Sequence, residues 1–186
     1  MKLPAKIKDK MAQLDSTTYN HSIRVWKLAL SVEEYYRMAD DSLSTAALVH
    51  DIGKLYISPA ILDKHEGFTE LERELVDLHP YIGYRMLKEC NVGEVVRRIV
   101  LYHHGRNPRL LSPLPEFYSS MVESKAKMLK TIDAFEALTT DRPYRRRMSV
   151  KQATAYLREQ EGYHRQVLRY LRENIHDFDH LSDAGR

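Results

Sequence analysis

A histidine and an aspartate stand side by side at the end of an apolar stretch, in the segment AALVHDIGK over residues 46–54. Burying an imidazole and a carboxylate is costly unless they are paired or bind a cation. The chain offers further groups of the same kind beside helical apolar patterns. The candidate metal ligands are therefore His21, His50, Asp51, His79, His103, His104 and Asp133. Imidazole and carboxylate ligands without thiolate suit iron, manganese, nickel or zinc, and argue against a structural zinc finger.

Core packing is the alternative explanation for each of these residues taken singly. A lone histidine on a helix is more often a packed or solvated residue than a ligand, and four histidines are interpreted in that way: His65, His164, His176 and His180. Packing alone does not account for a histidine, an adjacent His-Asp pair, a His-Pro pair, a double histidine and an aspartate in one short chain. The joint pattern favours a metal site.

The elements that must position these groups are predicted to be helices. Apolar residues recur at spacings of three and four, and no sustained alternation indicates a strand. The predicted helices cover 18–38, 42–50, 70–78, 81–89, 92–104, 119–139, 149–160 and 164–175. Thr69 and Glu72 have the form of a capping box at the start of one of them. The predicted fold is a compact all-α bundle with the metal site among its central helices.

Helix breakers adjoin the candidate ligands. Pro80 should interrupt the helical run and leave His79 at a helix junction. Gly53 is expected to end the helix after His50-Asp51, so that the chain turns and brings Lys54 near the ligands. His103 and His104 would diverge by about 100° on a regular helix. Both can bind metal only if the helix ends or bends there, which Gly105 would allow. The proline-rich stretch 105–118 is predicted to be a loop over the site.

Six segments in order carry a resemblance to a known family. They are NHSIRV at 20–25, LVHDIGK at 48–54, SPAILDK at 58–64, LHPYIGYRML at 78–87, YHHGR at 102–106 and IDAFEALTTDRPYR at 132–145. This set resembles the HD superfamily of metal-dependent phosphohydrolases, and within it the HD-GYP cyclic-dinucleotide phosphodiesterases of bacterial signalling. The resemblance implies that Asp51 bridges two metal ions. It assigns one ion to His21, His50, Asp51 and Asp133, and the other to Asp51, His79, His103 and His104.

The resemblance also implies a reaction. Two divalent ions, iron or manganese first and nickel or zinc as alternatives, would activate a hydroxide for in-line hydrolysis of a phosphoester. Asp51 and Lys54 are the expected catalytic residues, with Lys54 neutralising phosphate charge in the transition state. Glu136 lies one turn after Asp133. It either faces the site and orients water or Lys54, or it is a solvent-facing glutamate.

The sequence departs from the family pattern at two places. The double histidine is followed by Gly105-Arg106-Asn107-Pro108 rather than by a glutamate and a Gly-Tyr-Pro loop. Members that hold a third metal carry a glutamate one turn before the first histidine, where this chain has Thr17, and this favours two metals. Guanidinium groups suit phosphate oxygens. The expected substrate-binding residues are Lys54, Arg106, Arg109, Arg142 and Arg145, whereas Arg146 and Arg147 are expected to be solvated.

Length and composition restrict the class of protein. A chain of 186 residues fits one domain, 1–186, by the usual size range. No apolar stretch suits a membrane span or a signal peptide, and the single Cys90 forms no internal disulfide, so a cytoplasmic location is expected. The net charge of +3 is too small to indicate binding to a nucleic-acid polymer. A small phosphoester or nucleotide is the expected partner. The helices over 149–160 and 164–175 could pack on the core or on a second subunit of a homodimer.

Three functions are consistent with the residues and the resemblance. The first is a metal-dependent phosphodiesterase acting on a cyclic dinucleotide or related nucleotide. The second is a nucleotide phosphomonoesterase using the same metals, which the missing Gly-Tyr-Pro loop would favour. The third is a signalling or binding module that retains metal with weak or no turnover.

Overall fold

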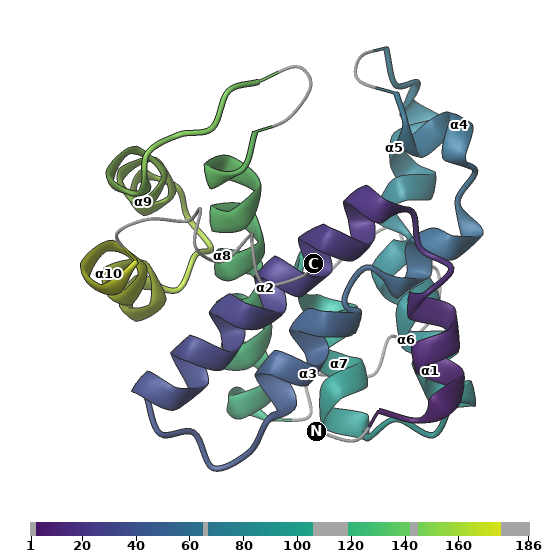
Figure 1. Ribbon diagram of the computed structural model, residues 1–186, viewed down its shortest axis with the longest axis horizontal. Helices are drawn as coiled ribbons and strands as arrows, with labels where there is room; N and C mark the ends of the chain where they lie inside the picture. Colours follow the sequence, from purple (N-terminus) through teal and green to yellow (C-terminus); the bar gives the residue numbers. More distant parts are fainter. Residues whose placement is uncertain (1–2, 65–66, 106–118, 142–144, 176–186) are drawn as a thin grey trace.

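A computed structural model describes residues 3–64, 67–105, 119–141 and 145–175, and these ranges contain helices and no β-strand (Figure 1). The predicted all-α fold is confirmed. The α-helices are α1 (Ala5–Met11), α2 (Ser16–Tyr35), α3 (Ser42–Val49), α4 (Pro59–Leu62), α5 (Glu70–Asp77), α6 (His79–Glu89), α7 (Glu94–Tyr102), α8 (Ser120–Thr139), α9 (Val150–Glu159) and α10 (Arg165–Asn174), with a 3₁₀ helix, η1 (Ile52–Tyr56), after α3. No helix in the described ranges is both long and apolar enough to cross a bilayer.

Four helices form the centre of the molecule. α2 packs on α3 and α8, while α7 packs on α3 and α8, and α6 covers α7 and η1 on the outer side. Large side chains from these helices are fully buried, among them Leu28, Leu43, Ile99 and Phe135. Each such burial contributes about 1.5–3 kcal/mol relative to exposure, so the central helices are held firmly together.

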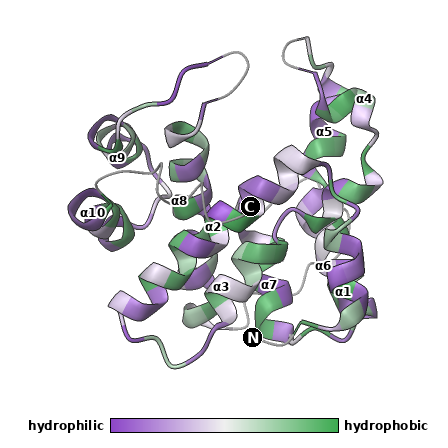
Figure 2. Ribbon diagram, viewed as in Figure 1, coloured by the Kyte–Doolittle hydropathy of each residue, from purple (hydrophilic) through white to green (hydrophobic). Residues whose placement is uncertain are grey.

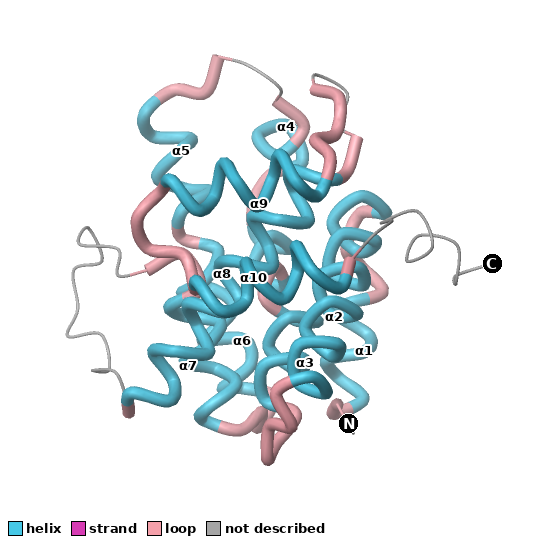
Figure 3. Tube along the Cα trace, turned by 90° about the vertical axis from the view of Figure 1, so that its left-hand side faces the viewer, coloured by secondary structure: helices cyan, strands magenta, loops and turns pink. Residues whose placement is uncertain are grey.

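The last two helices cover α8 on one side of the molecule (Figures 1 and 3). Both have a hydrophobic and a hydrophilic side (Figure 2). Their buried apolar residues belong to the main core cluster and include Leu157, Val167 and Leu171. Core packing, the first of the two alternatives for these helices, therefore accounts for those side chains. Tyr156 is 48% exposed and does not take part.

The helix boundaries agree with several sequence signals. Thr69 accepts from the backbone N–H of Glu72, and the Glu72 carboxylate accepts from the backbone N–H of Thr69, so the predicted capping box is confirmed. Asp15 caps the start of α2 by accepting from the backbone N–H of Thr18 at 2.9 Å. The short elements α1, η1 and α4 were not predicted. They have 7, 5 and 4 residues, too few for a repeated apolar spacing to be recognised.

Two predicted breaks lie next to the candidate ligands. α5 ends at Asp77 and α6 begins at His79, so His79 lies at a helix junction, as predicted. The new helix starts earlier than the predicted residue 81, because proline is tolerated in a first helical turn. α7 ends at Tyr102, and Gly105 has a φ of +93°, which is accessible to glycine at little cost. The predicted break at the double histidine is confirmed. Residues 106–118, the rest of the predicted loop, lie outside the described residues.

Gly53 has a different role from the one predicted. α3 already ends at Val49, and Gly53 lies inside η1. A Cβ at this position would lie 2.0 Å from the carbonyl oxygen of His79 and 2.7 Å from the backbone nitrogen of Gly83. Glycine is needed here because the backbones of η1 and α6 touch. The contact fixes the position of His79 relative to the segment that carries His50 and Asp51.

Gly53→Ala is therefore expected to destabilise the protein by about 1–3 kcal/mol, the usual range for overpacking, and by more if the backbone cannot shift. Urea unfolding would measure the change. Gly83→Ala is the matched control on α6, since its Cβ would meet no atom closer than 3.4 Å. Equal stability of the two variants would contradict the proposed backbone contact.

Candidate metal centre

The central helices bring the seven candidate ligands into one cluster. α2 carries His21, α8 carries Asp133, and the other five residues lie at or just beyond helix ends. The ligand atoms form three groups, each within 4.8 Å: His79 with His103 and His104, His21 with His50 and Asp133, and His50 with Asp51 and His103. Because these groups share His50 and His103, they are parts of a single cluster.

Asp51 lies between the two sides of the cluster. Its Oδ1 is 3.3 Å from Nε2 of His79. Its Oδ2 is 3.5 Å from Nε2 of His50 and 3.8 Å from Nε2 of His21. The two carboxylate oxygens thus face different histidines, an arrangement suited to the bridging role implied by the sequence resemblance. Asp133 lies on the His21 side, with its Oδ1 3.0 Å from Nε2 of that ring.

Three imidazoles are oriented by backbone carbonyls at helix ends. Nδ1 of each ring lies within hydrogen-bond distance of the carbonyl three residues earlier: His50 with Ala47 at 2.8 Å, His79 with Val76 at 2.7 Å and His103 with Val100 at 2.7 Å. The last carbonyls of a helix lack intrahelical donors and can accept these bonds. A carbonyl only accepts, so each Nδ1 carries the proton and each Nε2 presents a lone pair.

A bound cation would satisfy the lone pairs that converge here. Nε2 of His79 and Nε2 of His103 are 3.4 Å apart, yet neither has a proton to donate to the other. Nε2 of His50 is buried and has no hydrogen-bond partner among the described residues. Imidazoles whose other nitrogen donates to a carbonyl are typical of metal ligands. The residues therefore fit a divalent metal site.

The electrostatics give most of the cluster the protonation states that metal ligands need. Burial lowers the pKa of His79 to about 3 and that of His103 well below its usual range. Burial would raise the pKa of Asp51, but His50 and Lys54 outweigh it and hold that pKa well below its usual range.

The pKa of His21 is shifted in the opposite direction to those of His79 and His103. Burial opposes its protonation, but the Asp133 and Glu136 carboxylates raise its pKa to about 10. A cation beside Nε2 of His21 would take the place of that proton.

Glu136 faces the cluster from α8 and is fully buried, so the alternative of a solvent-facing glutamate was wrong. Its Oε2 accepts from Nδ1 of His21 at 2.5 Å, and its Oε1 accepts from Nε of Arg24 at 2.5 Å. The sequence did not indicate this pairing, because 115 residues separate Glu136 from His21. The only available signal was its position one turn after Asp133.

A cavity of about 210 Å³ opens onto the cluster, lined by Thr17, Thr18, His21, Asp51, Lys54, His104, Asp133 and Ala137. Lys54 is partly exposed and donates from Nζ to Oδ2 of Asp51 at 2.7 Å. The expected proximity of Lys54 to the ligands is confirmed. His104 lies on the exposed side of the cluster. A substrate entering the cavity would meet Lys54 and the ligands together.

The predicted phosphate-binding arginines fall mostly outside the described residues, which do not include Arg106, Arg109 or Arg142. Arg145 is described, and its Nη2 donates to the carbonyl of Ala137 at 2.5 Å. Ala137 also lines the cavity at the cluster. A phosphate contact by any of the four arginines remains a prediction.

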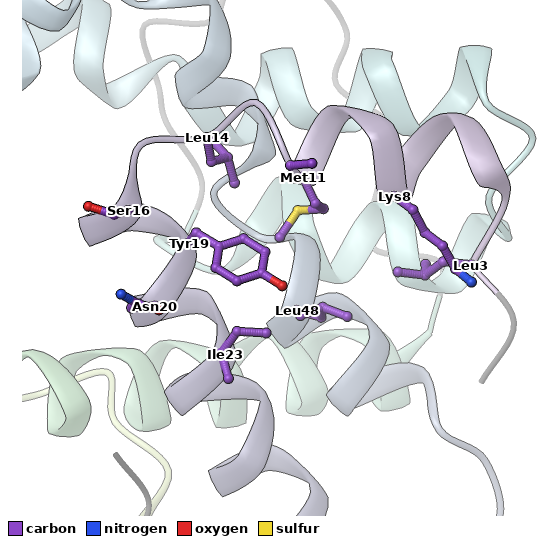
Figure 4. Close-up of a pocket in the computed structure, with 10 residues that line it drawn as sticks. Leu3, Lys8, Met11, Leu14, Ser16, Tyr19, Asn20, Ile23 and Leu48 are labelled. Carbon is purple, nitrogen blue, oxygen red and sulfur yellow. The ribbon is translucent and has the colours of Figure 1, made fainter. Parts of the chain in front are cut away.

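A larger cavity, of about 580 Å³, lies between α1 and the first turns of α2. Figure 4 shows mainly apolar side chains around it, including Met11, Leu14, Ile23 and Leu48. None of the seven candidate ligands lines this cavity. The chemistry that the sequence predicts therefore belongs to the smaller cavity.

Comparison with known proteins gives a consistent picture. A family model described as "HD domain" matches residues 18–138. The chain is 31% identical over 153 residues to a cyclic di-GMP phosphodiesterase of Pseudomonas aeruginosa, covering 80% of this chain and 37% of that protein. It is 32% identical over 122 residues to a 3′3′-cGAMP-specific phosphodiesterase of Vibrio cholerae, covering 63% of this chain and 25% of that protein. The matched regions thus span only 37% and 25% of the length of these two relatives.

A solved structure shows the same fold. The HD domain of the phosphodiesterase PgpH from L. monocytogenes superposes with a TM-score of 0.65 at 18% sequence identity, covering 96% of both chains. At this identity the likeness concerns the fold. It agrees with the helical architecture that surrounds the ligand cluster.

Proposed function

The chain belongs to the HD domain family, and from this premise we propose that it is a metal-dependent phosphodiesterase that hydrolyses a cyclic dinucleotide. The names of the relatives from Pseudomonas aeruginosa and Vibrio cholerae support this substrate class. The observation that carries the proposal is the cluster itself. Seven imidazole and carboxylate side chains converge beside a cavity that also holds a lysine.

We assign the ligands to two ions. His21, His50 and Asp133 would hold one, His79, His103 and His104 would hold the other, and Asp51 would contact both. When bound, such ions supply Lewis-acid activation of water and of the phosphoryl group. Iron or manganese suits this donor set, with nickel or zinc as alternatives. Thr17 lines the cavity where family members with a third metal carry a glutamate, which supports two ions rather than three.

The chain's own residues would bind and polarise the phosphoester. Lys54 is 24% exposed and lies at the cavity, so its ammonium group, which has three donors, can contact a phosphate oxygen while it stays paired with Asp51. Neutralising charge that develops in the transition state accelerates the reaction because the donor is already in place. Four arginines would add further phosphate contacts: Arg106, Arg109, Arg142 and Arg145.

A substrate panel tests the proposal. Protein loaded with manganese or iron would be incubated with cyclic di-GMP, 3′3′-cGAMP, a linear dinucleotide and mononucleotides, and products would be separated by chromatography. We expect the cyclic dinucleotides to be cleaved with the highest kcat/KM. Preference for mononucleotides would show a phosphomonoesterase instead. Metal-loaded protein that binds a dinucleotide without cleaving it would show a binding module.

The double variant Arg106→Ala, Arg109→Ala tests the source of substrate affinity. We expect KM for the cyclic dinucleotide to rise about tenfold, equivalent to about 1.4 kcal/mol, with a smaller change in kcat and no loss of metal. Such a pattern indicates contacts made equally in the bound substrate and the transition state. An unchanged KM with metal retained would mean that these two arginines are solvated, and attention would move to Arg142 and Arg145.

A further inference from the structure

His21 is oriented differently from the other anchored imidazoles of the cluster. His50, His79 and His103 bond through Nδ1 to carbonyls at helix ends. His21 is the sixth residue of α2, where each carbonyl accepts from the amide four residues on. No orphan carbonyl is available to this ring. Its Nδ1 needs an acceptor from elsewhere in the fold.

Glu136 supplies that acceptor from α8. Its Oε2 lies 2.5 Å from Nδ1 of His21. Its Oε1 accepts from Nε of Arg24 at 2.5 Å and from the hydroxyl of Thr140 at 2.9 Å. A buried carboxylate is costly unless it is paired and hydrogen-bonded, and these donors offset the cost. The carboxylate is thus held in place from two sides, by α2 and by the residue that follows α8.

We propose that Glu136 is a positioning residue that holds His21 with its Nε2 lone pair towards the metal, and that it thereby sets the affinity of one ion without setting that of the other. The ion concerned is the one assigned to His21, His50 and Asp133. This inference rests on the proposed two-ion centre but not on the identity of the substrate.

The selectivity follows from how each ring is anchored. With Nδ1–H bonded to Glu136, Nε2 of His21 points to Asp133, 3.0 Å away. On the other side of the cluster, His79 and His103 depend on Val76 and Val100 carbonyls, which a substitution at 136 leaves in place. Loss of a carboxylate that orients a metal-binding histidine typically costs 10–100-fold in metal affinity. The lower affinity should therefore concern only the ion assigned to His21, His50 and Asp133.

Titration with Mn(II), followed by the EPR signal of the free ion, tests the inference on metal-free wild-type protein, Glu136→Ala and Glu136→Gln. We expect two sites in the wild type. In Glu136→Ala one site should weaken by roughly 10–100-fold, while the other stays within about twofold. Glu136→Gln should show a smaller change, since its amide oxygen can still accept from His21 while its NH₂ group would face Arg24.

Glu33→Gln is the matched control. Glu33 is also a buried carboxylate, on the same helix as His21, and its Oε1 accepts from the backbone N–H of Ser44 at 2.9 Å. This variant should keep both affinities. If the wild type, Glu136→Gln and Glu136→Ala bound Mn(II) with the same affinities, the inference about Glu136 would be wrong while the proposed function could still stand. Equal weakening of both sites would have the same meaning. A wild type that binds no Mn(II) would overturn it together with the proposed function.

Imidazole NMR of the zinc-loaded protein gives an independent readout. The His21 Nδ1 proton should be protected from exchange in the wild type, because it is buried in the bond to Glu136. In Glu136→Gln it should exchange faster, whereas the corresponding protons of His79 and His103 should be unchanged. Faster exchange at all three rings would indicate general loosening and overturn the positioning role.

Discussion

Replacing Asp51 with alanine is expected to lower the metal content from about two ions per chain to near zero and to reduce hydrolysis to the level of the metal-free protein. The reason is geometric. Oδ1 of Asp51 faces His79, while Oδ2 faces His50 and His21, so one side chain serves both proposed ions. Each site would lose a negative ligand, and the remaining imidazoles would lie close together with less anionic charge to hold a cation. Metal analysis by mass spectrometry would measure the loss.

The control must separate loss of the metal from loss of an aspartate that pairs with a lysine, as Asp51 does with Lys54. Asp40→Ala removes an aspartate whose Oδ1 pairs with Nζ of Lys125 at 2.6 Å, away from the ligand cluster. That variant should keep both ions and full turnover. The bridging role of Asp51 would be wrong if Asp51→Ala retained two ions, and a wild type that stays metal-free when supplied with manganese or iron would contradict the two-ion centre.

Lys54→Ala is expected to keep both ions and to lower kcat by roughly 10²–10³, the usual effect of removing one preorganised electrostatic contact to a transition state. Lys54 reaches the cavity but binds Asp51 only through a hydrogen bond and ion pair at 2.7 Å. It is a donor rather than a ligand. Steady-state kinetics and metal analysis on the same preparation would show whether turnover and metal content separate.

Two further variants sharpen this test. Lys54→Arg keeps the positive charge and should recover part of the lost rate, although a guanidinium has a different shape and reach. Lys127→Ala is the control for loss of a lysine from an exposed position on α8. Turnover of Lys54→Ala at the wild-type rate would assign Lys54 to the helix end rather than to catalysis.

Much of the fold and the composition of the cluster could be predicted because their signals are local. Helical spacing indicated α2, α3 and α8 to within a few residues at each end. Pro80 and Gly105 marked the two breaks because proline and glycine restrict or extend the backbone wherever they stand. The ligand residues were recognised by their order along the chain. None of these inferences required knowledge of which helices touch.

The features that escaped prediction are contacts between distant segments. Gly53 looked like a helix terminator, since the sequence does not show that its backbone meets the carbonyl of His79. Glu136 could be placed on the correct face of α8, but its partner His21 lies on another helix. The carbonyl bonds of His50, His79 and His103 depend on where three helices end to within one residue, which apolar spacing does not determine.

The backbone carbonyls that anchor three of the histidines affect which metal-binding properties a single mutation can change. A carbonyl belongs to every residue type, so no single substitution at Ala47, Val76 or Val100 deletes the acceptor that orients His50, His79 or His103. The corresponding acceptor for His21 is a side chain, and one codon change can remove it. Random mutagenesis outside the ligands should therefore yield variants with altered affinity for the ion at His21 more readily than variants with altered affinity for the other ion. The two halves of a shared centre would then diverge under selection at different rates.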